Sequence, residues 1–342
     1  MPIPGKLLTT AMAVMPHTDV DRELEAALSL DIPFWPQLPN YKYYEDMYVQ
    51  ASEHFPGMLL DLEKRTLRFS LDKFIEEFEE FLSRSEDDPS YFDISPTYSV
   101  VYHRFLNLDL SNRPAIRGQL EGPISFGFNI LDQNERPILF DDTVRPFMLE
   151  FMAKRINTQL ARLKKRNDNA FMFVDEPGLQ FLFSAISGYE DRKAKADMDA
   201  FFNMIDRPRG IHLCGNPDWD FLLNLDMDAL SMDVFTNGEI FASYAESIKR
   251  YLKRDGVLVW GIVPTGFEDF SKANISMLGK QLENIWDVLA QKGIEIESIL
   301  NQSFLSPATC CLVNPDKELT VEKAFTMINE LSYFLKEKYR IL

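Results

Sequence analysis

The sequence predicts an α/β fold, a TIM-type (β/α)8 barrel. Short apolar runs alternate along the chain with amphipathic segments of helical spacing, and about eight of these runs are candidate strands. The chain has 342 residues, enough for one such barrel, and contains no repeat, low-complexity tract or clear linker. We therefore expect a single catalytic domain spanning residues 1–342. The alternative, a doubly wound open sheet, lacks the glycine-rich turn after the first strand.

The first half of the chain supplies the less regular part of the predicted barrel. Residues 19–30 open with acidic side chains, which suit the positive end of a helix. Apolar residues recur at helical spacing within residues 71–83. Residues 58–70 and 96–108 are interpreted as hairpin-like additions to the barrel. The expected strands are 7–15, 32–38 and 116–122, and a long helix is expected at 141–165.

In the second half of the chain, predicted strands and helices alternate regularly. Its expected strands are 170–177, 210–215, 229–235, 257–264 and 298–307. Its expected helices lie near 190–205, 217–224, 241–253, 275–292 and 319–338. Strands that alternate with helices indicate parallel pairing through right-handed crossovers.

Composition excludes several classes of partner. The net charge of −17 repels nucleic acid and anionic membranes. No apolar run approaches the ~20 residues of a membrane span, and the N-terminus lacks the features of a signal peptide. We therefore expect a cytoplasmic protein. Cys214, Cys310 and Cys311 are too few for a disulfide framework, so they are either buried or chemically active.

Polar residues stand where several predicted strands end, which is where barrel enzymes place their active sites. His212 and Cys214 are the sharpest pair, because residues two apart in a strand project from one face. Imidazole and thiolate together favour zinc. The alternative to a zinc site is that His212 is a hydrogen-bonded histidine of the core and that the cysteines are small buried side chains.

Other strand ends carry further candidates. Asp233 is a carboxylate ligand, a cap for the following helix or the partner of a lysine in the barrel. Of Asp175 and Glu176, only one can face the barrel mouth, where it would bind a substrate ammonium or accept hydrogen bonds from a loop. His17 either lines the mouth or is a loop histidine with no metal role.

Motifs along nearly the whole chain resemble a known family. They are TTAMAVMPHTD, IPFWPQLP, GQLEGPISFGF, FVDEP, HLCGNPDWDFLL, ALSMDVF, WGIVPT and LSPATCCL. Together they resemble the C-terminal catalytic domain of cobalamin-independent methionine synthase, in its short stand-alone form. The wider superfamily also contains uroporphyrinogen decarboxylase and zinc methyltransferases that act on methylated corrinoid proteins.

The resemblance implies roles for individual residues. Zn2+ would be held by His212, Cys214, Asp233 in place of the family's glutamate, and Cys310, with Cys311 as the alternative to Cys310. Asp175 falls on the position that binds the amino group of homocysteine. Met12 and Val14 lie in the run that matches the family's substrate-contacting Ile-Gly-Ser.

The resemblance also implies an activity, a zinc-dependent S-methyltransferase that activates a thiol, with homocysteine as the leading acceptor. A methylated corrinoid protein is the favoured donor over methyltetrahydrofolate. The folate-associated domain of the long family members is missing from this sequence, and residues 262–266 lack their proton-donating histidine. The alternatives are another thiol acceptor, a metal-free decarboxylase-like lyase, and a barrel whose zinc is structural.

Overall fold

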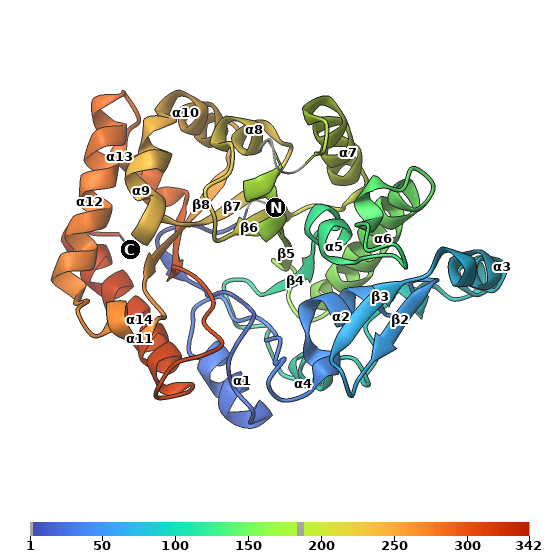
Figure 1. The fold of residues 1–342 in the computed structure, drawn as a ribbon. Coiled ribbons are helices and arrows are strands. Elements are labelled where there is room, and N and C mark those ends of the chain that lie inside the picture. The colour runs from blue at the N-terminus through green and yellow to red at the C-terminus, as the bar shows by residue number, and fades with distance from the viewer. Residues whose placement is uncertain (1–2, 183–187, 342) are drawn as a thin grey trace.

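Seven parallel strands form the centre of the molecule, and helices surround them (Figure 1). The computed structural model describes residues 3–182 and 188–341. The strands of this sheet are β1 Leu8–Thr9, β4 Arg117–Glu121, β5 Phe171–Asp175, β6 Arg209–Leu213, β7 Ala229–Asp233, β8 Val257–Val263 and β9 Ser303–Pro307. Their order, β1-β9-β8-β7-β6-β5-β4, follows the chain around a curled sheet, as in a TIM-type barrel.

The eighth barrel position, between β1 and β4, has no regular strand among the described residues. Residues 32–38 lie there and make only the isolated bridges Val14–Gln37 and Phe34–Arg117. The two prolines at positions 33 and 36 have no amide hydrogen to donate, so a continuous ladder cannot form. The expectation of a regular strand at 32–38 is therefore wrong, and the barrel prediction is confirmed for seven strands.

Helical segments connect the strands and cover the sheet. In the first half they are α1 Val20–Leu28, η1 Tyr43–Glu45, α2 Met47–Ser52, α3 Leu71–Asp87, η2 Pro89–Phe92, α4 Val100–Leu106, α5 Pro123–Asn129, η3 Ile138–Phe140 and α6 Val144–Lys164. In the second half they are η4 Pro177–Phe181, α7 Asp191–Met204, α8 Trp219–Asn224, α9 Val234–Ser243, α10 Ala245–Lys253, α11 Phe267–Phe270, α12 Ile275–Gln291, α13 Ile296–Asn301 and α14 Leu319–Tyr339. Within the described ranges, no helix has the length and apolar character needed to cross a membrane.

Three further predicted elements have different outcomes. The hairpin at 58–70 is confirmed as the antiparallel pair β2 Met58–Asp61 and β3 Thr66–Phe69. The hairpin at 96–108 is wrong, because helix α4 forms there with the Ser99 side chain capping its first turn. The first half of the predicted strand 298–307 is helix α13, and only its second half pairs as β9.

The register of the sheet decides which side chains face the barrel interior. Phe171 and Phe173 of β5 pack in one buried cluster with residues of β7, β8 and β9. Side chains alternate along a strand, so Asp175, two positions beyond Phe173, shares this inward face. Any residue that pairs with Asp175 on a neighbouring parallel strand faces inward as well.

Candidate metal and substrate site

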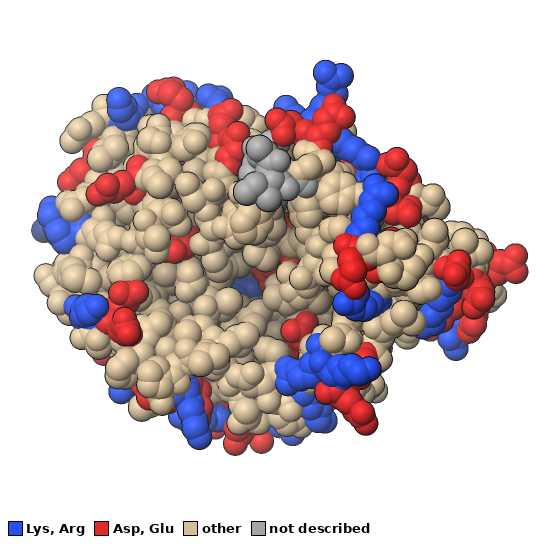
Figure 2. Space-filling model, in the orientation of Figure 1, with Lys and Arg blue, Asp and Glu red and all other residues tan. Residues whose placement is uncertain are grey.

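A row of polar side chains crosses the carboxyl ends of neighbouring strands. Glu121 pairs with Asp175, Asp175 with His212, and His212 with Ser231. Because paired residues of parallel strands project to the same side, this row lines the interior of the barrel mouth. Figure 2 shows a hollow in the middle of this face, with charged side chains inside it and mostly uncharged residues around it.

His212 is the best-defined metal donor in the row. Its Nε2 lies 3.2 Å from Sγ of Cys214, and its Nδ1 lies 3.0 Å from Oγ of Ser231. Burial, with a smaller contribution from the charge of Arg117, lowers the pKa of His212 to about 3, so the ring is neutral at pH 7. A neutral imidazole that is hydrogen-bonded through one nitrogen offers the lone pair of the other, as histidine ligands of metals do.

Cys310 brings a second thiol to Cys214. A hydrogen bond between the two side chains raises the pKa of Cys214 and lowers the pKa of Cys310. Cys310 is an exposed residue at the rim, and its thiol is directed at Cys214. The Sγ of Cys311 instead lies 3.4 Å from the carbonyl oxygen of Val313. The structure thus places Cys310, rather than Cys311, beside the pair of His212 and Cys214.

Asp233 ends β7, and the helix that follows engages its carboxylate. Its Oδ1 accepts a hydrogen bond from the backbone amide of Thr236 at 3.0 Å, which caps α9. Burial raises the pKa of Asp233, and the hydrogen bonds at this cap oppose that rise. The structure therefore shows Asp233 in the helix-capping role that the sequence left open beside the ligand role.

The possible metal donors at the mouth are His212, Cys214 and Cys310. In the described parts of the chain, no group of three or more His, Cys, Asp and Glu side chains is arranged to hold a metal. The contacts are pairwise, from His212 to Cys214 and from Cys214 to Cys310. One neutral imidazole and two thiols are nevertheless the donor chemistry of a zinc site, and the Ser231 contact fixes the orientation of the ring.

Asp175 and Glu176 point in opposite directions, as adjacent strand residues must. Glu176 accepts hydrogen bonds from the backbone amides of Ile124 and Ser125 and from the Ser125 hydroxyl, so it anchors the start of α5. Asp175 faces the mouth, where burial raises its pKa to about 7 against the opposing charge of Arg117. Of the two acids, Asp175 is the one available to a substrate.

Glu121 is a candidate residue that the sequence analysis missed. It is completely buried, and neither carboxyl oxygen has a hydrogen-bond partner among the described residues. Burial and the charges of Glu176 and Asp175 raise its pKa, and Tyr48 on α2 lowers it by a smaller amount. A signal was present in the sequence, since Arg117, Gln119 and Glu121 alternate in a strand, which marks a polar inward face.

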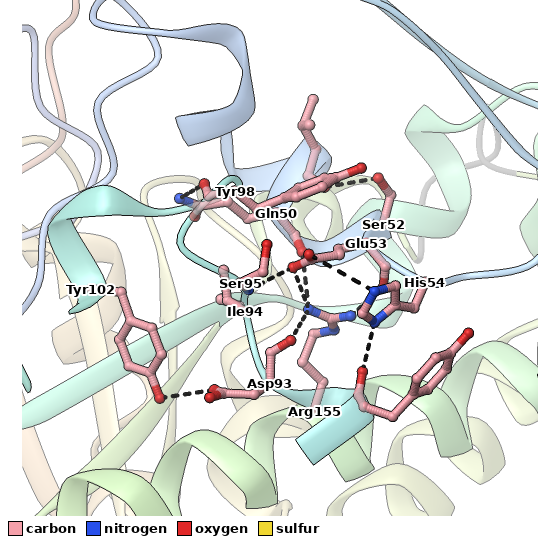
Figure 3. Close-up of polar contacts among 12 residues, drawn as sticks. Gln50, Ser52, Glu53, His54, Asp93, Ile94, Ser95, Tyr98, Tyr102 and Arg155 are labelled. Carbon is pink, nitrogen blue, oxygen red and sulfur yellow. Dashed lines mark hydrogen bonds and ion pairs between the residues drawn. The ribbon is translucent and has the colours of Figure 1, made fainter. Parts of the chain in front are cut away.

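Helix α2, which carries Tyr48, is fastened to the barrel at its C-terminal end (Figure 3). Arg155 of α6 donates to the carbonyl oxygens of Gln50 and Asp93, each at 3.4 Å, and to that of Glu53. It also lies 3.8 Å from the carboxylate of Glu53. A fully buried guanidinium thus satisfies the carbonyl groups at the helix end, which otherwise lack partners.

The remaining predicted residues lie along the chain that follows β1. His17 is buried and directed at α14, with its Nε2 3.2 Å from Glu322. Burial lowers the pKa of His17, and the hydrogen bond to Glu322 opposes this shift. Met12 is buried, and Val14 is partly exposed at its bridge to Gln37. His17 is therefore directed at Glu322 of α14, and its other ring nitrogen has no hydrogen-bond partner among the described residues.

No protein-family model matches the chain, and no curated protein does. Solved structures of similar fold include a methyltransferase and a methionine synthase. A methyltransferase from Methanosarcina mazei has a TM-score of 0.55 and 13% identity, over 96% of this chain and 94% of that chain. A B12-independent methionine synthase from Shewanella sp. W3-18-1, in complex with selenomethionine, has a TM-score of 0.55 and 12% identity, over 100% of both chains. At these identities the likeness establishes the fold alone.

Proposed function

We propose that this chain is a zinc-dependent S-methyltransferase that acts on a small thiol. The observation that carries the proposal is the contact between His212 and Cys214 at the end of β6, with Cys310 hydrogen-bonded to the same thiol. Two solved proteins of this fold are described as a methyltransferase and a methionine synthase, which supports the same class of reaction.

His212, Cys214 and Cys310 would hold the ion, and Asp233 would join them only by leaving its cap on α9. When bound, zinc allows a substrate thiol to bind as a thiolate near neutral pH. Ser231 keeps Nδ1 of His212 occupied, so that Nε2 stays directed at Cys214. With Asp233 engaged in its cap on α9, these three side chains would hold the ion and leave it able to take a substrate sulfur.

The carboxyl groups of the mouth bind the other end of the substrate. Asp175 and Glu121 are neighbours on β5 and β4, and both face inward. Burial raises the pKa of both carboxyl groups even though the charge of Arg117 acts on Asp175, so a ligand that carries an ammonium group would favour their ionised forms. Homocysteine, with an amino group and a thiol on a short chain, is the acceptor that this arrangement supports best.

For the methyl donor we favour a methylated corrinoid protein. In that reaction the sulfur–methyl bond forms as the cobalt–methyl bond breaks, and the bonding electron pair stays on cobalt. Exposed apolar side chains follow β8 and β9 at the mouth, namely Phe267, Leu312 and Val313. An apolar rim around a thiol site suits a donor that is presented on the surface of another protein.

The test measures zinc content and the zinc X-ray absorption spectrum. We expect about one zinc per chain in the wild type and in Cys311→Ser, with loss of zinc in Cys214→Ser and Cys310→Ser. Adding homocysteine is expected to add a sulfur neighbour to the metal. A metal-free wild type purified without chelators contradicts the proposal and favours the lyase. Bound zinc whose X-ray absorption spectrum does not change when homocysteine is added indicates that the substrate is another thiol or that the zinc is structural.

A further inference from the structure

The chain that carries Cys310 leaves β9 and lies against the end of β8. Its first amide after the strand, that of Ala308, donates to the carbonyl oxygen of Val263 at 2.8 Å. This close approach requires a glycine at position 261 of β8. A Cβ on Gly261 would lie 2.6 Å from the carbonyl oxygen of Met232 and 3.0 Å from Cα of Ala308. The chain after β9 is therefore held against β8 before it reaches Cys310.

Thr265 holds the peptide group that leads into Cys310. Strand β8 ends at Val263, because Pro264 has no amide hydrogen with which to continue the ladder, and Thr265 follows directly. The hydroxyl of Thr265 donates to the carbonyl oxygen of Thr309 at 2.9 Å, and the two hydroxyl oxygens lie 3.3 Å apart. Thr265 is only 2% exposed, so its loss would leave this carbonyl without its donor in a site that water reaches poorly.

Asn314 attaches the same segment on the other side of Cys310. Its Nδ2 donates to the carbonyl oxygen of Thr265 at 2.9 Å, and its Oδ1 accepts from the backbone amide of Phe267 at 2.9 Å. The side chain is buried, and both ends of its amide group are bonded to the turn that follows β8. The segment 308–314 is thus attached to this turn at both of its ends, with Cys310 between the two attachments.

We propose that Thr265, supported by Asn314, is a positioning residue that holds the thiol of Cys310 against that of Cys214. Cys310 is itself exposed, so burial of its own side chain does not keep it at the barrel mouth. Thr265 and Asn314 act through the backbone on either side of Cys310. A thiol that is held in place beforehand needs less ordering when it binds a metal. The inference deepens the zinc site of the proposed function and rests on it for its purpose, whereas the distance between the two thiols can be tested without a metal.

The first measurement is the rate at which the two thiols are cross-linked in the absence of metal. The full-length protein is treated with a chelator and then with dibromobimane, a reagent that becomes fluorescent when it has alkylated two thiols. Every protein carries Cys311→Ser, so that Cys214 and Cys310 are the only thiols in the chain. The thiol of Cys311 is bonded to the carbonyl oxygen of Val313, and a serine hydroxyl can make the same bond.

The variants remove the two attachments separately. Thr265→Val removes the hydroxyl and keeps the shape of the side chain, Thr265→Ser keeps the hydroxyl, and Asn314→Ala removes the second attachment. Ser332→Ala is the matched control, because Ser332 is also buried and donates to a backbone carbonyl oxygen, that of Leu7, at 2.7 Å. Circular dichroism checks that each variant is folded, and Asn314→Ala carries the test if Thr265→Val does not fold.

We expect cross-linking to be about five- to tenfold slower in Thr265→Val and Asn314→Ala, and to stay within about twofold in Thr265→Ser and Ser332→Ala. An unchanged rate in both Thr265→Val and Asn314→Ala overturns the proposal, because Cys310 is then held by something else. A similar fall in Ser332→Ala also overturns it, because the effect is then a general loosening of the fold. No cross-linking in the parent protein overturns it as well, because the two thiols are then not neighbours.

Zinc affinity is the second measurement, and it separates this inference from the proposed function. Thr265→Val is expected to raise the zinc dissociation constant about 10- to 100-fold, and Thr265→Ser is expected to leave it within a few-fold of wild type. Equal zinc affinity in Thr265→Val and wild type shows that Thr265 does not position a metal ligand and overturns the proposal. If the wild type binds no zinc but the cross-linking rates change as expected, the proposed function fails and the positioning of Cys310 by Thr265 stands.

Discussion

Among single residues, Ser231 orients the ring of His212. Its hydroxyl occupies Nδ1, which leaves Nε2 available to a metal ion. Its hydroxyl lies 3.0 Å from Nδ1, and both side chains are buried. Replacing Ser231 by alanine leaves that nitrogen unpaired and the ring free to turn. We expect Ser231→Ala to raise the zinc dissociation constant about 10- to 100-fold, measured by competition with a chelating dye. Ser231→Thr keeps the hydroxyl and should remain within a few-fold of wild type; equal affinity in all three proteins contradicts this role.

We expect Glu121 to make the protein prefer thiol ligands that carry an amino group. The matched ligands are homocysteine and 4-mercaptobutyrate, which differ only in the ammonium. In Glu121→Gln the dissociation constant of homocysteine, divided by that of 4-mercaptobutyrate, should rise about tenfold, mainly through weaker binding of homocysteine. Calorimetric titration of both ligands measures this. The same ratio in wild type and variant would place the ammonium away from Glu121.

Glu23 makes the stability of the protein depend on pH. It is fully buried on α1, both of its carboxyl oxygens lack partners among the described residues, and burial and the nearby Glu45 raise its pKa well above 4.5. Above pH 4.5 the unfolded chain releases this proton and the folded chain retains it, so stability falls as pH rises toward the folded pKa. We expect Glu23→Gln to stabilise the protein by about 1–3 kcal/mol at pH 8 and by less at pH 5.

Thermal unfolding at both pH values measures the effect of Glu23. Glu25→Gln, an exposed acid on the same helix, is the control and should change stability at neither pH. A Glu23→Gln variant whose advantage does not grow with pH would mean that Glu23 is already ionised in the folded protein.

The residues of the site differ in how far the sequence could predict them. Alternation along one strand was enough to place His212 and Cys214 on the same face, and their side chains are in contact. The role of Asp233 could not be decided from the sequence, because a carboxylate at a strand end can be a metal ligand or a helix cap. The position of the Thr236 amide, which only the structure gives, shows that it is a cap. Glu121 was missed because the groups that surround its carboxyl group come from β5 and α2, far away along the chain.

At the scale of elements, Arg155 holds α2 in place. It has no exposed surface, and it donates to three carbonyl oxygens near the end of α2 and in the loop before α4. Arg155→Met removes the donor of those oxygens and the cation beside the Glu53 carboxylate, which keeps only its hydrogen bond from the Ser95 amide and its contact with His54. We expect it to lower the free energy of unfolding by about 3–5 kcal/mol, measured by urea denaturation. Lys154→Met, at the exposed neighbouring position, is the control; similar stability in the two variants contradicts the anchoring role.

The regular elements could be predicted because their patterns are local, and the irregular ones could not. Helix α6 and strands β5 to β8 agree with the predicted elements to within a few residues, since burial on both sides gives continuous apolar runs. Residues 32–38 also form an apolar run, but their prolines prevent regular pairing. The segment 96–108 was misread because the cap at Ser99 and the buried face of α4 override its β-branched residues.

For the whole molecule, the parallel sheet brings residues from distant parts of the chain to one mouth, and the same topology places the loops after β8 and β9 beside it. Phe267 is 42% exposed and Val313 is 87% exposed on those loops. If the methyl donor is a corrinoid protein, these side chains contact it before the thiol does. Free methylcobalamin makes no such protein contact and still reaches the mouth.

We therefore expect Phe267→Asp/Val313→Asp to raise KM for a methylated corrinoid protein tenfold or more and to leave the rate with free methylcobalamin within twofold. Ile75→Asp, a similar change on the exposed face of α3, is the control and should affect neither donor. Steady-state methylation of homocysteine with each donor separates the outcomes. An equal loss with both donors would show that the loops shape the thiol site itself, and no loss with either would direct the search for the donor to another surface of the barrel.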